Sequence, residues 1–360
     1  MTPLSRWAWR HVLAGAWLWW VFPLAGAPPW SDLLRRPDPW FAGAEGRRTT
    51  QNILSWQSAE GSWPKNQDTT RSPYTGDPAR IRGTFDNGAT VDELRYLARA
   101  WQATGDAPCQ QAFLKGLDHI LRAQYPTGGW PQFYPPGDQY HRHITFNDGT
   151  MVRLMEWVRE VRASDRYAFV DPARREQCAR AFDRGIACIL RCQIRVRGRL
   201  TGWCAQHDEV DFRPRPGRAY ELVSLSGAES VGIVRLLMSL ERPSPEVVNA
   251  VEAAVAWLKS ARIEGWREAR VADERSPKGW NKVMVADPDA PPLWARFYEI
   301  ETNRPIYVDR DGIPKYALAE IGYERRNGYA WHGDWPRPLL EKEYPAWKAR
   351  LEPRAGAREG

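Results

Sequence analysis

Two short segments that pair an acid with an amide are the clearest candidates for chemistry in the chain. TFDNGAT places Asp86 next to Asn87, and TFNDGTM places Asp148 next to Asn147. Each segment precedes an amphipathic stretch, so ordinary helix N-capping is one explanation, worth about 1 kcal/mol per cap. If the two segments meet, their carboxylate and amide oxygens suit a hard cation such as calcium. The two carboxylates could equally serve as the acid and base of an inverting glycoside hydrolase.

Arginine side chains supply the opposite charge. Arg218 opens the segment RAYELVSLSGAES, and Arg296 and Arg310 lie in ARFYEIETNRPIYVDRDG. A guanidinium pairs with a carboxylate through two parallel hydrogen bonds, so these residues suit a ligand that carries carboxylates. A solvated surface position is the simpler explanation for any one of them alone. Together with a metal site, the arginines favour an acidic substrate.

Motifs of several other enzyme classes are absent from the sequence. It contains no GxSxG nucleophile elbow, no P-loop, no GxGxxG dinucleotide motif and no Cys-x-x-Cys zinc pair. The five cysteines are an odd number, so at least one has no partner within a monomer. Disulfides in an exported protein and buried small apolar side chains both remain open for them.

Internal repeats indicate the elements that must position these residues. Segments that end a helix with Ile-Leu or Trp-Leu, turn at a glycine and continue to a tryptophan start near residues 53, 120, 189 and 257, in steps of 67, 69 and 68. A second set alternates with them: TFDNGAT, TFNDGTM and SLSGAES each lead into an amphipathic stretch. Each repeat is therefore predicted to hold two helices and a long loop.

Such helical hairpins predict an all-α fold, an (α/α)3 toroid with long loops and an open groove. Antiparallel hairpins put the starts of one helix set at the same end, so the three segments should gather around one mouth. The third carries Ser226-Gly227-Ala228-Glu229 in place of an acid-amide pair, so we do not expect it to add an equivalent ligand. Strand-like alternation is scarce throughout.

Composition and charge fit an exported, folded protein. The 360 residues are 43% hydrophobic and 26% charged, which supports a folded core, and the 20 tryptophans suit either large buried rings or sugar stacking. The net charge of +7 comes without a basic run or a nucleic-acid-binding signature, so no nucleic-acid partner is expected. Residues 1–27 follow the pattern of a secretory signal peptide. The protein should be secreted or periplasmic, without stable membrane insertion once that peptide is removed.

At this point the chain resembles the polysaccharide lyase family 10 pectate lyases, over about residues 50–350. The resemblance lies in the joint order of seven motifs: WQSAEGSWPKN (56–66), GTFDNGAT (83–90), TGGWPQFYP (127–135), ITFNDGTM (144–151), RAYELVSLSGAES (218–230), ARFYEIETNRPIYVDRDG (295–312) and NGYAWHGDWP (327–336). It implies the toroid-like fold expected from the repeats. The domain organisation becomes a signal peptide at 1–27, an N-terminal extension at 28–50, a catalytic domain at 51–350 and a tail at 351–360.

The resemblance also implies a reaction, calcium-assisted β-elimination on polygalacturonate that leaves a 4,5-unsaturated end. By position in the motifs, Arg218 would be the base, and Asp86 and Asp148 would bind Ca2+ with Asn87 beside them. Substrate contacts would come from Arg296 and Arg310, and from Lys65 and Asn66 of the WPKN turn. Calcium and arginines would stabilise the charge that develops next to the uronate carboxylate. An arginine base needs nearby cations or alkaline conditions, which predicts an alkaline optimum.

Two further interpretations stay open, and the chain is expected to act as a monomer in each. An inverting glycoside hydrolase would use Asp86 and Asp148 as its acid and base. A carbohydrate-binding protein without catalysis would use its tryptophans as stacking platforms.

Overall fold

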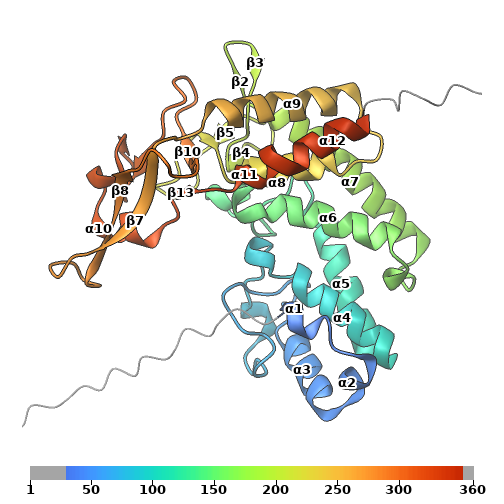
Figure 1. The fold of residues 1–360 in the computed structure, drawn as a ribbon. Helices are drawn as coiled ribbons and strands as arrows, with labels where there is room; N and C mark the ends of the chain where they lie inside the picture. The colour runs from blue at the N-terminus through green and yellow to red at the C-terminus, as the bar shows by residue number, and fades with distance from the viewer. Residues whose placement is uncertain (1–29, 352–360) are drawn as a thin grey trace, which may run out of the picture.

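A computed structural model describes residues 30–351, so the expected signal peptide at 1–27 lies outside the described residues. Helical hairpins stack along the molecule and form its main body (Figure 1). They are α4 (Val91–Thr104) with α5 (Ala107–Ala123), α6 (Thr150–Ala163) with α7 (Pro172–Cys192), and α8 (Glu229–Met238) with α9 (Pro245–Ser260). Helices α1 (Trp30–Leu33), α2 (Asp38–Ala42) and α3 (Ala44–Ser55) cover the N-terminal end, and α10 (Tyr323–Gly328), α11 (Pro336–Pro338) and α12 (Tyr344–Leu351) follow the last hairpin.

Local sequence explains where these helices begin. Thr90 and Glu93 form a capping box at the start of α4, and Gly105 ends that helix in the left-handed conformation. Asp171 caps α7 by accepting the backbone N–H of Arg174, and Ser244 caps α9 in the same way. The hairpins that the repeats predict are therefore formed by ordinary capping chemistry.

The predicted tryptophan turns close each repeat against its own helix. The indole N–H groups donate to carbonyl oxygens near helix ends: Trp63 to Ile53 at 2.7 Å, Trp130 to Ile120 at 2.9 Å and Trp203 to Ile189 at 2.8 Å. These indoles are fully buried, so each needs such a partner. The twenty tryptophans are thus partly explained by turn construction rather than by ligand stacking.

Glutamines at the same points of the repeat join one hairpin to the next. The side-chain amide of Gln57 donates to Gly61 and to Ala112 of α5, that of Gln124 to Gly128 and Ala181 of α7, and that of Gln193 to Thr201 and Ala250 of α9. Each amide therefore ties its own turn to the following outer helix.

The fourth repeat differs from the expectation. Trp294, and not Trp266, donates to the end of the preceding helix, at Leu258 with a distance of 2.7 Å. Trp266 instead begins an exposed hairpin of two strands, β7 (Trp266–Ala272) and β8 (Trp280–Ala286), which pair antiparallel over seven residues. This hairpin is inserted between helix α9 and its tryptophan, which hides the repeat from a search at fixed spacing.

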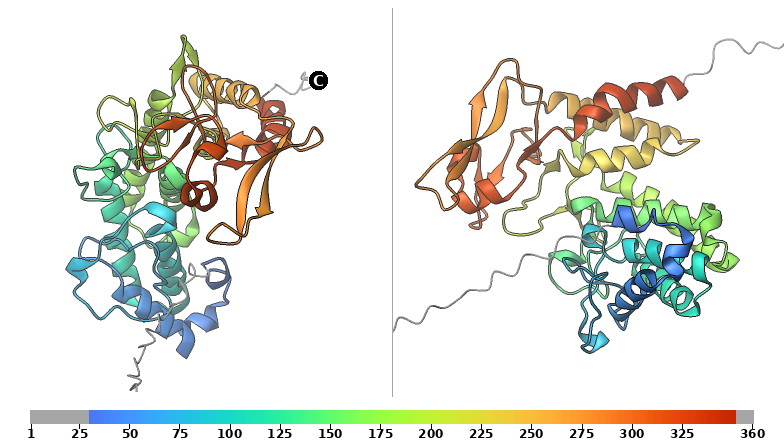
Figure 2. Two further views of the ribbon diagram at one scale, coloured as in Figure 1. Left: turned by 90° about the vertical axis from the view of Figure 1, so that its left-hand side faces the viewer. Right: turned by 60° about the horizontal axis from the view of Figure 1, so that its bottom comes forward.

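The all-α toroid expected from the sequence is wrong. Besides the hairpins, the described residues form six small antiparallel sheets. In addition to β7–β8 these join β1 (Ile144–Thr145), β4 (Gln206–His207) and β5 (Pro214–Arg215); β6 (Leu225–Ser226) and β10 (Phe297–Tyr298); β9 (Trp294–Ala295) and β13 (His332–Gly333); β2 (Arg195–Val196) and β3 (Arg199–Leu200); and β11 (Tyr307–Val308) and β12 (Pro314–Lys315). Figures 1 and 2 place the first and last hairpins at opposite ends of the stack, so the hairpins do not close a ring.

Two hydrophobic cores support this arrangement. The larger runs through all the hairpins, and a smaller one lies under the C-terminal loops around Phe297, Tyr307 and Trp331. All five cysteines are buried and free, as expected for small apolar side chains. Within residues 30–351, no helix combines the length and apolar character needed to cross a bilayer.

Candidate active site

The two acid-amide segments form short turns that do not cap helices. Residues Asp86–Gly88 (η2) and Asn147–Gly149 (η4) are single 3-10 turns that lie side by side. Helix α4 is capped by Thr90, and the Asp86 and Asp148 carboxylates accept no helix N–H. The N-capping explanation therefore does not apply, and both carboxylates make contacts other than helix capping.

The structure also refines how the two turns correspond. Asn87 (φ 54°, ψ 26°) and Asp148 (φ 51°, ψ 26°) share the left-handed position, so Asp86 corresponds to Asn147. In the first turn the acid is buried and the amide exposed, whereas in the second turn the amide is buried and the acid exposed. The pair of turns thus presents one inner and one outer carboxylate.

Asp86 is buried and only half satisfied. Its Oδ2 accepts hydrogen bonds from Lys65 Nζ and, at 2.7 Å, from Gln132 Nε2. Its Oδ1 has no hydrogen-bond partner among the described residues. A buried carboxylate oxygen without a partner is costly, and a bound cation would satisfy it.

Arg296 connects the second turn to the start of helix α8. Its Nη2 donates to Asp148 Oδ1 at 2.9 Å and to Glu229 Oε1 at 2.6 Å. Burial opposes a charge here, but these two carboxylates outweigh it and hold the pKa of Arg296 above its ordinary value. The third segment therefore also brings a carboxylate, that of Glu229, into the cluster. This contact was not predicted from the sequence.

Gly227 permits this contact between distant segments. Strand β6 pairs with β10, and the Gly227 N–H donates to the carbonyl of Arg296 at 2.9 Å. A Cβ at Gly227 would stand 2.2 Å from the Ala295 carbonyl oxygen. Only glycine allows the two backbones to approach so closely, which brings Glu229 to Arg296.

Arg218 is held by a buried acid three residues later. Its Nε donates to Glu221 Oε2 at 3.0 Å, and its Nη2 donates to Glu221 Oε1. Burial acts against the charge, but the hydrogen bonds and charge of Glu221 prevail and raise the pKa of Arg218. Tyr329 donates to Glu221 Oε1 at 2.9 Å, and Arg296 stacks 5.1 Å from the ring centroid of Tyr329. Tyr329 therefore links the surroundings of the two arginines.

The remaining candidates lie nearby but differ in their surroundings. Arg310 forms a bidentate ion pair with Glu324, and its loop reaches Ala219, since a Cβ at Gly312 would be 3.5 Å from the Ala219 carbonyl oxygen. Lys65 is committed to Asp86, and Asn66 is exposed with φ 59°. All the predicted residues thus belong to one region, although Arg310 is turned towards an acid of its own.

Several residues of this region were not identified from the sequence. Besides Glu229 they are Glu221, Gln132, Tyr140 and Tyr329. Burial raises the pKa of Tyr140 above its ordinary value, and the charges of Arg218, Glu221 and Asp86 also act on this group. Only Glu221, three residues from Arg218, gave a local signal; the others reach the site through long-range packing.

A second group of ligand-type side chains, His143, Asp208 and Glu209, has atoms within 4.8 Å of one another. Its carboxylates are already occupied, because Arg215 pairs with Asp208 at 2.7 Å and Arg142 with Glu209 at 2.6 Å. His143 adds a 3.0 Å contact to Glu209. These pairs tie loops around strand β4, and none of the three side chains has a buried polar atom left without a partner among the described residues, in contrast to Asp86.

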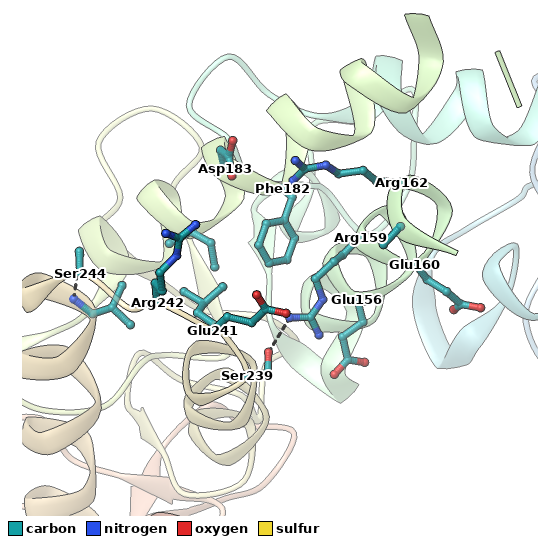
Figure 3. A pocket seen from close by; sticks show the side chains of 14 residues that line it. Glu156, Arg159, Glu160, Arg162, Phe182, Asp183, Ser239, Glu241, Arg242 and Ser244 are labelled. Atoms are coloured by element: carbon teal, nitrogen blue, oxygen red, sulfur yellow. Dashed lines mark hydrogen bonds between the residues drawn. The ribbon is translucent and has the colours of Figure 1, made fainter. Parts of the chain in front are cut away.

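A pocket of about 900 Å3 lies at the opposite ends of the same helices (Figure 3). Phe182 and Leu240 line it together with charged residues of both signs, and Arg159 crosses it to donate to Ser239 at 2.6 Å. None of the site residues predicted from the sequence lines this pocket. The turn end is therefore the better candidate for chemistry.

Comparison with known proteins found matches that cover most of the chain. A family model described as pectic acid lyase matches residues 57–340. A family 10 polysaccharide lyase from Cellvibrio cellulosa superposes with a TM-score of 0.75 at 32% sequence identity, covering 90% of this chain and 97% of that one. A mutant of that lyase in complex with trigalacturonic acid gives a TM-score of 0.73 at 32% identity, covering 87% and 95%. No curated protein sequence matched.

These matches span the hairpins, the turns and the loops that carry the arginines. The family model begins at Gln57, before Lys65, and continues past Arg296 and Arg310, so every candidate residue lies within it. The resemblance inferred from seven motifs is thereby confirmed. The chain belongs to the pectic acid lyase family and is a pectate lyase.

Proposed function

We propose that the protein cleaves polygalacturonate by calcium-assisted β-elimination with Arg218 as the base. One observation carries this proposal: the carboxylates of Asp86, Asp148 and Glu229 gather beside Arg296 and Arg218 at one end of the hairpins. The related lyase crystallised with trigalacturonic acid supports the substrate class.

The donor set suits calcium. Asp86 and Asp148 would hold the ion with Asn87 beside them, since all three offer hard oxygen atoms and Asp86 Oδ1 has no other partner among the described residues. When bound, the ion would neutralise the uronate carboxylate and so acidify the neighbouring C–H bond. Glu229 is a further oxygen donor close to Asp148.

The protein's own residues would carry the other roles. Arg296 and Arg310 bind substrate carboxylates, and Lys65 and Asn66 line the approach to Asp86. Arg310 must leave Glu324 to do so. Because Arg310 and Glu324 are both exposed, we expect this exchange of one carboxylate for another to cost little.

In the reaction, neutral Arg218 accepts the proton from C5 of a galacturonate. The electron pair of that bond forms the C4–C5 double bond as the C4–O4 bond breaks. The leaving oxygen takes a proton from solvent, and Arg218 later returns its own proton to solvent. A guanidinium beside Glu221 holds its proton strongly, so this step requires alkaline conditions or the displacement of Glu221.

The test follows the ultraviolet absorbance of unsaturated uronates on polygalacturonate at alkaline pH. Parallel reactions contain calcium, a chelator, or the Arg218→Ala variant. We expect a rise in absorbance that the chelator and the substitution each abolish. New reducing ends without absorbance would indicate a hydrolase, and binding without either signal would indicate a carbohydrate-binding protein.

The proposal also covers the cellular location of the protein and the bounds of its catalytic domain. Export directed by residues 1–27 would place the enzyme in the periplasm or outside the cell, where it would act as a monomer. The catalytic domain would span residues 51–350.

A further inference from the structure

Arg82 differs from the other arginines of the site because no acid holds it. Arg218, Arg296 and Arg310 each pair with a carboxylate, whereas the described residues give Arg82 neither an ion pair nor a hydrogen bond. Its side chain is exposed and lies over the ring of Phe133, with its Cζ 4.3 Å from the ring centroid. Stacking on an aromatic face holds a guanidinium in place and leaves its N–H edge free for a carboxylate.

Backbone hydrogen bonds build this position from four separate segments. The N–H of Thr84 donates to Trp63 at 2.9 Å, that of Phe85 to Gln132 at 3.1 Å, and that of Gln132 to His141 at 2.9 Å. These bonds set Arg82 and Phe133 side by side and keep both close to Lys65 and Asp86. The arrangement is therefore held by the fold and is not a chance contact of a surface side chain.

The surroundings of Phe133 are aromatic and positively charged. Lys65 Nζ lies 5.9 Å from the Phe133 ring centroid, and the His141 ring meets Phe133 edge-on at 5.2 Å. Burial, followed by the charges of Arg82 and Lys65, lowers the pKa of His141, so this ring adds no positive charge of its own at neutral pH. Tyr140 packs on His141 at 4.4 Å and feels the charges of Arg218 and Asp86. These side chains thus extend from Arg82 towards the proposed base.

A hollow of about 250 Å3 opens beside Arg82 and Phe133. Its volume is below that of pockets for drug-sized ligands, and it suits a single sugar ring. Glu60 and Arg80 also line it. An acidic polymer that contacts Asp86 through one unit can therefore present a neighbouring unit to Arg82.

We propose that Arg82, stacked on Phe133, forms an additional subsite that binds the carboxylate of a second galacturonate unit along the polymer. This subsite rests on the proposed function, because it extends the binding of the same polygalacturonate chain. It acts by binding and orientation and takes no part in bond cleavage. It should therefore favour long, de-esterified chains over short or methyl-esterified ones.

The test compares steady-state kinetics of Arg82→Ala with those of the wild type. We expect KM on polygalacturonate to rise about tenfold with kcat little changed, as for loss of one charge-assisted contact. Arg82→Lys should recover part of the loss, and Phe133→Leu should reproduce part of it. Arg122→Ala, an exposed arginine of α5 outside the hollow, is the matched control. Equal KM values for Arg82→Ala and Arg122→Ala would overturn the subsite.

Calorimetric titration with polygalacturonate oligomers in chelator separates this proposal from the lyase reaction. The oligomers should bind the wild type more tightly than Arg82→Ala, and the difference should shrink for oligomers too short to reach both Arg296 and Arg82. A wild type without lyase activity would refute the proposed function, while the titration would still decide on the subsite. Equal affinities of the two proteins for long oligomers would refute the subsite and leave the reaction intact.

Discussion

At the scale of single residues, the site consists of opposite charges that restrain one another. Glu221 holds Arg218, Glu229 and Asp148 hold Arg296, and Lys65 covers one oxygen of Asp86. The motifs of the sequence pointed to these arginines and to the two aspartates as candidates. The sequence could not show which acid holds which arginine, because Glu229 and Arg296 are 67 residues apart and meet only through the pairing of β6 with β10.

Glu221→Gln tests whether the protonation of Arg218 limits the reaction. The amide removes the negative charge that raises the pKa of Arg218, so the neutral guanidine becomes accessible at lower pH. We expect the rising alkaline limb of the kcat/KM profile to move to lower pH. Tyr329→Phe, which removes a hydrogen bond to Glu221 but no charge, should move it less. If the alkaline limb of the kcat/KM profile of Glu221→Gln stays at the wild-type pH, Arg218 is not the base.

At the scale of elements, helices could be predicted and strands could not. The helix starts carried local signals, such as Thr90 with Glu93 or Ser244 with Pro245. Most strands are two residues long and exist only because a distant partner pairs with them, as Ile144–Thr145 does with Gln206–His207. The longer hairpin β7–β8 mixes apolar and polar residues on both faces, so it lacks the alternation that marks a half-buried strand.

Glu93 gives helix α4 a dependence on pH that can be measured. Burial raises its pKa to about 8 from the ordinary 4.5, while Thr69 and the Thr90 N–H donate to its carboxylate. Between these two values the folded chain keeps a proton that the unfolded chain has released. The free energy of unfolding should therefore fall as the pH rises through this range.

Glu93→Gln keeps the capping geometry but cannot ionise. We expect urea denaturation to show a gain in stability over the wild type at a pH above 8 and little difference near pH 5. Glu156→Gln, at an exposed site on α6, is the control and should not alter the pH dependence. If Glu93→Gln lost stability equally at both pH values, the carboxyl group would be needed for packing and its ionisation would be irrelevant.

At the scale of the whole molecule, three of the four repeats were predicted because each closes on itself. Trp63, Trp130 and Trp203 bond to a helix within their own repeat, so their spacing in the sequence stays regular. The open stack and its small sheets depend on how repeats meet one another. The toroid was inferred from the repeated hairpins and from the family resemblance, and the number of hairpins does not determine whether a stack closes.

The three glutamine ties between hairpins allow the coupling along this stack to be measured. Gln57, Gln124 and Gln193 make equivalent bonds, each to one turn carbonyl and one helix carbonyl. The helix carbonyl keeps its intrahelical bond in a Gln→Leu variant, so the turn carbonyl is the group left without a donor, at about 1–3 kcal/mol if it stays buried. A stack in which each hairpin contacts mainly its neighbours can unfold in parts. Because one hydrophobic core runs through all the hairpins, we instead expect a single transition in each variant.

Urea denaturation followed by both tryptophan fluorescence and circular dichroism decides between these behaviours. Coincident transitions, shifted to lower urea by similar amounts in all three variants, would mean that the hairpins fold as one unit. A separate early transition in Gln57→Leu alone would mean that the N-terminal hairpin opens by itself. That hairpin carries Asp86 and Arg82 beside it, so its independent opening would expose the substrate-binding end while leaving the Arg296 cluster folded.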